Sequence, residues 1–338
     1  MKRPAVISAI AFICLAPHVR AQDFKAYQNY DFVAGEKVLF EDDFRADTDG
    51  EFPAHWKLVS GQGVVNKFNG EPVFALTDGN YAVVEPRMKV KSYLTDPFTI
   101  EFDFFPKAGG FEKLIVFLKN ADDEERRVGF GYDVWTEALE HDLTASYPGS
   151  SEDFKDKWHH VAMIFKNKQV KCYEDQFRVL VVPDFDFAPQ SASFGGIGDG
   201  ANPLIFKNVR IASGGGMNTL DALTKDGKYI THGILFDVSQ ATVKPQSMGA
   251  ISEVVKALKA NPALKVEIGG HTDADGDAAK NMTLSQARAD AVKKIMVDQG
   301  IDAARLTTKG YGASKPIDKN DSPEGKANNR RVEFTKVG

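Results

Sequence analysis

The chain has 338 residues, which is long enough for two domains, each with its own hydrophobic core. Hydrophobic residues make up 43% and charged residues 26% of the sequence, which is typical of a folded protein and excludes a disordered or fibrous one. The formal net charge of −5 excludes a strongly basic protein, so nucleic acid is not an expected partner.

The N-terminus has the features of a secretory signal peptide. Lys2 and Arg3 precede the apolar run AVISAIAFICLA, and residues 19–21, Val-Arg-Ala, provide small side chains at positions −3 and −1 of a cleavage site. The run ends at Pro17, so it is shorter than the about 20 residues that a spanning helix needs. We therefore predict a signal peptide over residues 1–21 and an exported protein.

The two cysteines predict a mature chain without disulfides. Cys14 lies in the predicted signal peptide, and the preceding Phe12 and Ile13 lack the small residue of a lipoprotein site. Cys172 then remains alone and cannot form an internal disulfide, so we expect it to be a small buried hydrophobic residue.

Residues 38–212 contain short runs of alternating apolar and polar residues, separated by turn-rich spacers. The clearest runs cover residues 97–105, 112–120, 159–167 and 206–212. Many short strands at this spacing, without a long amphipathic helix, predict an all-β sandwich or barrel.

A glycine-rich break at residues 213–216 marks a change of pattern, and we predict a linker over 213–227 and a second domain over 228–338. Strands are predicted at 229–238, 264–270, 305–310 and 330–336, and helices at 248–258 and 284–295. The apolar stripe of the second helix is predicted to be Leu284, Ala287, Ala291, Val292 and Ile295. Thr283 and Gln286 have the form of a capping box. This β-α-β-α-β-β order predicts an α+β sandwich with helices on one sheet face.

Arg288 borders the apolar face of the second predicted helix, four residues after Leu284 and four before Val292. An isolated arginine at such a position extends its alkyl stem along the core and its head group into water. Asp273, however, lies at the end of the preceding strand, in the loop that leads into this helix. The two side chains either form an ion pair or, with space between them, present both charges to a zwitterionic ligand.

A larger pattern around these residues resembles the OmpA-like peptidoglycan-binding domain, which is shared by outer-membrane protein A, the Pal lipoprotein and MotB. It consists of HTDADGDAAKNMTLSQARADAV, then GYGASKPI, then SPEGKANNRRVEF, and it covers roughly residues 228–336. The resemblance implies a domain that binds the stem peptide of peptidoglycan without cutting it and needs no cofactor. It also implies a location in the periplasm or at the outer membrane of a Gram-negative-type bacterium.

The resemblance further implies the residues of the site. Asp273 matches the position that binds the ammonium group of diaminopimelate, and Arg288 matches the position that binds its carboxylate. A guanidinium holds a carboxylate through two parallel hydrogen bonds, which lysine cannot reproduce. The other implied site residues are Asn281, Thr272 and the weaker candidates Asp237 and Arg330. For Arg330, an ordinary charge at a strand edge is the alternative.

Three residues near this pattern are not expected to bind a ligand. Asp275 and Asp277 lack the glycine placement and the distant glutamate of a calcium-binding EF-hand loop, so we expect no metal there. Lys326 departs from the arginine that the family often has, but it does not touch the proposed pair.

Residues 38–212 resemble laminin-G-like and concanavalin-like jelly rolls. The stretch KWHHVAMIFKNKQVKCYEDQFRVLVVP is similar to the tryptophan-histidine strand, polar turn and following strand of that fold. The resemblance implies a jelly-roll sandwich that could bind a glycan or an envelope protein. Trp56, Trp135 and Trp158 are candidate sugar platforms, although core packing is the commoner role of tryptophan.

The sequence does not predict an enzyme. Glu101 and Asp103 begin the carboxylate spacing of jelly-roll glycosidases, but Phe105 stands where the second glutamate belongs. Two hypotheses remain, a sandwich joined to a peptidoglycan-binding domain and, as the alternative, a porin-like outer-membrane β-barrel joined to the same domain. The sandwich is favoured because LIVF and VAMIF are apolar on both strand faces.

Overall fold

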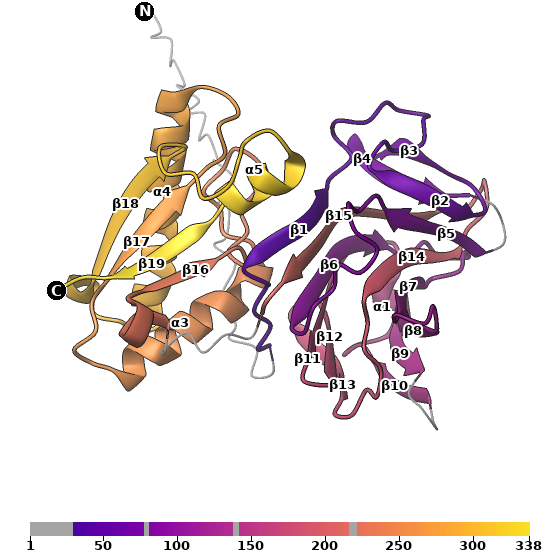
Figure 1. The fold of residues 1–338 in the computed structure, drawn as a ribbon, viewed down its shortest axis with the longest axis horizontal. Helices are drawn as coiled ribbons and strands as arrows, with labels where there is room; N and C mark the ends of the chain where they lie inside the picture. The colour runs from indigo at the N-terminus through magenta and orange to yellow at the C-terminus, as the bar shows by residue number, and fades with distance from the viewer. Residues whose placement is uncertain (1–29, 78–80, 138–141, 216–221) are drawn as a thin grey trace, which may run out of the picture.

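The computed structural model describes residues 30–77, 81–137, 142–215 and 222–338. The predicted signal peptide, residues 1–21, lies outside these ranges. Figure 1 shows two parts side by side, which we name the β-sandwich (described residues between 30 and 215) and the C-terminal part (222–338). No helix of the described residues is long and apolar enough to cross a membrane.

The first sheet of the β-sandwich, which we call the larger sheet, has eight antiparallel strands. Their order is β13 (Phe177–Val182), β12 (Gln169–Glu174), β11 (His159–Lys166), β6 (Phe98–Phe105), β15 (Leu204–Ser213), β4 (Glu71–Leu76) and β3 (Gly63–Phe68), and β1 (Lys37–Asp42) also pairs with β15. The predicted runs 97–105, 159–167 and 206–212 correspond to β6, β11 and β15, so these three predictions are confirmed.

The second, smaller sheet has seven strands. Their order is β10 (Asp142–Ser146), β9 (Asp133–Glu137), β8 (Glu125–Phe130), β7 (Leu114–Lys119), β14 (Ser191–Ile197), β5 (Tyr81–Pro86) and β2 (Trp56–Ser60), and the short helix α1 (Ser151–Phe154) precedes β11. The predicted run 112–120 corresponds to β7. The finer resemblance to a concanavalin-like jelly roll stays a prediction.

One aromatic core joins the two sheets. Phe102 of the larger sheet is fully buried and lies against Phe194 and Phe130 of the smaller sheet, with ring centroids 5.9 and 5.5 Å apart. Cys172 is free and fully buried in the same cluster. This confirms the prediction that it is a small buried hydrophobic residue. Burial raises the pKa of its thiol, so the thiol stays protonated.

The three tryptophans are all engaged in packing. Trp56 is fully buried, and its indole N–H donates to Asp42 Oδ2 at 2.9 Å. Trp135 covers Gly129 on the neighbouring strand, where an added Cβ would lie 2.1 Å from the indole nitrogen. Trp158 is half-buried against the ring of Phe105. The core role is therefore confirmed for Trp56.

The C-terminal part is built on a four-stranded sheet in which only β17 and β18 pair in parallel. The strand order is β16 (Lys228–Thr231), β19 (Val332–Lys336), β17 (Val266–His271) and β18 (Leu306–Gly312). The helices are α3 (Met248–Ala260), α4 (Ala278–Asp298) and α5 (Pro323–Asn329), with short helical turns at η1 (Ala222–Asp226), η2 (Pro245–Ser247) and η3 (Ala303–Arg305). The sequence predicted α3 and α4 but missed α5, because its single amphipathic turn gives no periodic signal.

Helix α4 packs on β17 and β18 through small residues. Its buried residues are Ser285, Ala289, Val292 and Met296. Ala287, which we predicted on the apolar stripe, is exposed instead. Two glycines cause this arrangement, since a Cβ on Gly270 would lie 2.1 Å from the Ser285 carbonyl oxygen and one on Gly310 would lie 2.5 Å from the Gln286 nitrogen. The helix therefore contacts the sheet backbone directly.

The predicted capping box of α4 is wrong. The helix begins earlier, where Asp277 is the N-cap and accepts the Lys280 N–H at 2.8 Å. Thr283 lies inside the helix and donates its hydroxyl to the Ala279 carbonyl at 3.0 Å. A carboxylate N-cap upstream satisfies the free N–H groups of the first turn, so Thr283 has none to cap.

The predicted strand 229–238 ends early, at Thr231. His232 leaves the sheet and its Nε2–H donates to the Asn328 carbonyl at 2.9 Å, while the Gly233 N–H donates to Thr231 Oγ1 at 3.0 Å. Residues 234–236 then line a cavity between the two parts. These two bonds, one of them to a residue far along the chain, replace the strand ladder that the apolar sequence alone would have continued.

The two parts meet across β1 and the segment ahead of it. Asn328 of α5 is buried, and its side-chain amide accepts the Val38 N–H at 2.8 Å and donates to the Val38 carbonyl at 3.3 Å. Tyr30 and Phe32 lie between Tyr173 of β12 and Gly249 of α3, where an added Cβ would lie 2.4 Å from the Phe32 carbonyl oxygen. Figure 1 shows β1 next to α5 at this junction.

A group of buried charges lies on the face of the larger sheet that is turned toward the C-terminal part. Glu101 pairs with Arg210 at 2.7 Å, and His160 Nδ1 pairs with Asp103 at 2.8 Å. Burial alone would lower the pKa of His160, but the Asp103 and Glu101 carboxylates outweigh burial and raise the pKa to about 9. His160 is therefore charged at neutral pH, and the group holds two positive and two negative charges.

We predict that Trp56→Phe lowers the free energy of unfolding by roughly 1–3 kcal/mol, because it leaves the buried Asp42 carboxylate with one hydrogen-bond donor fewer. Urea unfolding measures the change. Trp158→Phe is the matched control, since that ring is only half-buried and its indole N–H has no such partner among the described contacts. Equal losses in the two variants would contradict the role assigned to the hydrogen bond.

We predict a second stability effect that depends on pH. The pKa of His160 is about 9 in the folded chain and about 6.5 when unfolded, so its contribution is fully present below pH 6.5 and is lost as the pH rises through 9. The stability advantage of the wild type over His160→Gln should therefore shrink by on the order of 3 kcal/mol between pH 6 and pH 10. Urea unfolding at several pH values tests this, and an advantage independent of pH would refute it.

Candidate functional site

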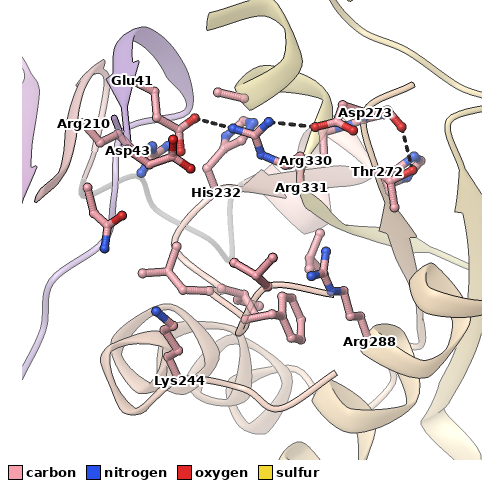
Figure 2. Close-up of a pocket in the computed structure, with 18 of the residues that line it drawn as sticks. Glu41, Asp43, Arg210, His232, Lys244, Thr272, Asp273, Arg288, Arg330 and Arg331 are labelled. Atoms are coloured by element: carbon pink, nitrogen blue, oxygen red, sulfur yellow. Dashed lines mark hydrogen bonds and ion pairs between the residues drawn. The ribbon is translucent and has the colours of Figure 1, made fainter. Parts of the chain in front are cut away.

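A cavity of about 560 Å³ lies between the β-sandwich and the C-terminal part. Figure 2 shows Asp273, Arg288 and Arg330 of the C-terminal part around this cavity, together with Glu41 and Asp43 of the β-sandwich. The volume is in the range of sites for small organic ligands. The wall is therefore made by both parts of the chain.

Asp273 is positioned by the end of β17. The loop after this strand starts at Thr272, which is buried and whose hydroxyl donates to the Asp273 carbonyl at 2.8 Å. One carboxylate oxygen of Asp273 accepts the Asp275 N–H at 3.1 Å, and the other accepts Arg330 Nη1 at 2.7 Å. The carboxylate side chain is only 14% exposed, so it is held in one orientation at the cavity wall.

Arg288 projects from α4 into the same cavity. Its Nε–H donates to the Gln240 carbonyl at 2.9 Å and its Nη2–H donates to the Asp237 carbonyl at 3.4 Å, while the guanidinium lies 4.8 Å from the centre of the Phe236 ring. Burial, and then the like charge of Arg330, lower the pKa of Arg288, although a guanidinium stays protonated at neutral pH. Within the described part of the chain it pairs with no carboxylate, so its charge is available to a ligand.

The remaining predicted site residues have different places. Asn281 donates to the Asp275 carbonyl at 2.8 Å and lies 3.5 Å from that of Asp273, so it shapes the loop. Asp237 acts through its backbone carbonyl on Arg288, while its carboxylate is half-exposed and lies 3.8 Å from Lys244. Thr272 likewise supports the loop, because its hydroxyl donates to the Asp273 carbonyl.

Arg330 is central to the wall and not an ordinary strand-edge charge. Its Nη1 donates to Asp273 and its Nη2 to Glu41 of β1, both at 2.7 Å. Burial alone would lower its pKa, but the charges of Glu41 and Asp273 outweigh burial and raise the pKa. Its neighbour Arg331 is fully enclosed and pairs with Glu333 at 2.7 Å, so it supports the sheet.

Glu41 is a cavity-lining residue that the sequence did not reveal. It stands 289 residues before Arg330, in a strand whose alternating pattern makes it look like an ordinary exposed charge. No local spacing relates the two positions. Only the docking of β1 against α5 brings them together.

The other carboxylates of the loop after Asp273 stabilise the local structure. Asp277 caps α4, and Asp275 pairs with Lys326 at 2.9 Å. Lys326, where the family often has arginine, thus ties α5 to this loop. In the ranges that the structure describes, no group of three or more His, Cys, Asp or Glu side chains could hold a metal ion.

Comparison with known proteins places these residues in a family. Residues 235–330 match the model of the OmpA family. The chain is 44% identical to Probable lipoprotein YiaD of Escherichia coli (strain K12) over 118 residues, which are 34% of this chain and 54% of that protein. It is 43% identical to Outer membrane porin F of Pseudomonas fluorescens over 100 residues, which are 30% of this chain and 31% of that protein. The matched region thus spans about half of the first relative and about a third of the second.

Among solved structures, the chain is similar to the cell wall anchor of the T6SS from Pseudomonas aeruginosa, with 32% identity and a TM-score of 0.30 over 33% of this chain and 80% of that one. It is also similar to the peptidoglycan-associated lipoprotein from Burkholderia pseudomallei, with 27% identity and a TM-score of 0.29 over 31% of this chain and 88% of that one.

The family match includes Asp273, Arg288 and Arg330, the residues that form the cavity wall on the C-terminal side. It points to no catalytic family. Residues 235–330 of this chain are therefore an OmpA family domain.

Proposed function

We propose that this chain is a non-catalytic envelope protein that attaches to peptidoglycan by binding the diaminopimelate of the stem peptide. The proposal depends on the environment of Arg288. This partly buried cation faces the cavity and pairs with no carboxylate among the described residues. A ligand carboxylate would supply the missing partner.

The two ends of the ligand suit the two sides of the cavity. The free end of diaminopimelate carries a carboxylate and an ammonium group. The carboxylate would receive two parallel hydrogen bonds from Arg288, and the ammonium would donate to Asp273, whose side chain also faces the cavity. Asn281 and Thr272 would hold the Asp273 loop in the binding geometry.

The expected affinity for one stem peptide is modest, because charge-assisted hydrogen bonds contribute about 1.5–3 kcal/mol each. Peptidoglycan repeats the same group at high density, so rebinding at neighbouring stem peptides would keep the protein attached. Such weak, repeated contacts suit an attachment that must follow a growing wall.

We extend the proposal to location and organisation. The relatives named for lipoprotein and outer-membrane roles support an envelope location for this chain, at the outer membrane or in the periplasm, with residues 1–21 as a signal peptide. Domains over 38–212 and 228–338, with a linker at 213–227, remain part of the proposal. The β-sandwich would bind a glycan or another envelope protein. The porin-like alternative is not favoured, because the described strands before residue 214 stack as two sheets around an aromatic core.

We predict that Asp273→Asn and Arg288→Ala each weaken co-sedimentation of the full chain with purified peptidoglycan by at least roughly tenfold. Each variant removes one of the two charges that the ligand needs. Free diaminopimelate should compete with the wild type. Arg288→Lys should also weaken binding, because lysine keeps the charge but loses the parallel pair of bonds.

The control is Lys294→Ala, which removes an exposed cation from the same helix, one that pairs with Asp298. Circular dichroism confirms that each variant is folded. Wild type that stays in the supernatant, or folded Arg288→Ala that pellets like Lys294→Ala, would show that the cavity is not the peptidoglycan site.

A further inference from the structure

One guanidinium connects the β-sandwich to the Asp273 carboxylate of the proposed ligand site. Arg330 donates one nitrogen to Asp273 and the other to Glu41, at 2.7 Å each. Figure 2 shows the three side chains in a row along one wall of the cavity, with Arg288 apart from them. Glu41 is 29% exposed and belongs to β1 of the sandwich, while the other two residues belong to the OmpA family domain.

We propose that Glu41 is a positioning residue of the peptidoglycan site, which sets the affinity of Asp273 for the ligand ammonium group by holding Arg330. The β-sandwich is then part of the binding site and not a separate module. This inference rests on the proposed function.

The geometry of Arg330 supplies the first reason. A guanidinium that faces a single carboxylate prefers to hold it with two parallel bonds, which occupy both oxygens. Here Glu41 takes one nitrogen, so Arg330 bonds to Asp273 through Oδ2. Among the described residues, Oδ1 accepts one hydrogen bond, from the Asp275 N–H. A carboxylate has about four acceptor positions, so those that remain can receive an ammonium group.

The balance of charge supplies the second reason. Glu41, Arg330 and Asp273 together carry one negative charge, and Arg288 across the cavity carries one positive charge. This arrangement complements a zwitterion. Without the charge of Glu41 the row would be neutral, and it would attract an ammonium group less strongly.

Docking of the two parts does not depend on Glu41. Asn328 holds both backbone groups of Val38, and Tyr30 and Phe32 fill the gap in front of Gly249. These contacts are uncharged and lie outside the row of Glu41, Arg330 and Asp273. Glu41→Gln therefore keeps the junction while it removes one charge, and the new amide oxygen can still accept from Arg330.

Asp43 is the matched charge control. It lines the same cavity from the β-sandwich, but its carboxylate pairs with Arg45 at 3.0 Å instead of Arg330, and it is 45% exposed. Asp43→Asn removes the same charge from the same wall, at a carboxylate that pairs with Arg45 and not with Arg330.

The test is calorimetric titration of the full chain with two probes. The first probe is a synthetic stem tripeptide that ends in diaminopimelate, and the second is the same tripeptide with the diaminopimelate side-chain amine acetylated. We expect Glu41→Gln to bind the first probe roughly tenfold more weakly than wild type. It should bind the second probe as wild type does, because that probe lacks the ammonium group. Asp43→Asn should stay within about twofold of wild type on both.

The outcomes separate this inference from the proposed function. Wild type that does not bind the first probe, or binds it no better than Arg288→Ala, overturns the proposed function and the inference with it. If Arg288→Ala loses binding while Glu41→Gln does not, only the role of Glu41 is refuted. An equal loss of Glu41→Gln on both probes would mean a structural role, and an equal loss in Asp43→Asn would mean a general field effect. Either result overturns the inference.

Discussion

The shared guanidinium of Arg330 is the contact on which the arrangement of charge at the proposed site depends. It joins Asp273 of the OmpA family domain to Glu41 of the β-sandwich in one row of alternating charge. The Arg330 side chain is 40% exposed, and the opposite charge beside it comes from two distant parts of the chain. The same contact therefore shapes the wall of the proposed ligand site, at a junction that uncharged contacts hold together.

The junction around this contact is built from uncharged groups that tolerate little displacement. The Asn328 side chain hydrogen-bonds to both backbone groups of Val38, as a neighbouring strand would. Gly249 leaves space for the Phe32 carbonyl, which the Cβ of any other residue would occupy. Because these contacts hold β1 against α5, the Glu41 side chain has a fixed position next to Arg330. Packing at the junction thus fixes the electrostatics of the cavity.

Local pattern predicted much of the fold because alternation and helical periodicity act over a few residues. It placed β6, β7, β11 and α3 close to their observed bounds. It failed where contacts distant in sequence replace the local preference. The buried stripe of α4 begins at Ser285 because Gly270 and Gly310 bring sheet backbone against the helix, and a hydrophobicity pattern cannot show this. The strand predicted over 229–238 ends at Thr231 because His232 bonds to Asn328, far along the chain.

The sequence by itself predicted the candidate pair Asp273 and Arg288, since both lie on adjacent elements in one motif that resembles the OmpA-like peptidoglycan-binding domain. It could not determine whether the two charges would neutralise each other. Tertiary structure decided that Asp273 pairs with Arg330 and that Glu41 joins the wall. It also decided that the Arg288 guanidinium donates to two carbonyl groups, lies over a ring and pairs with no carboxylate of the described residues. The physical reason is that an ion pair depends on distance in space, and 289 residues of chain separate Glu41 from the arginine that it holds.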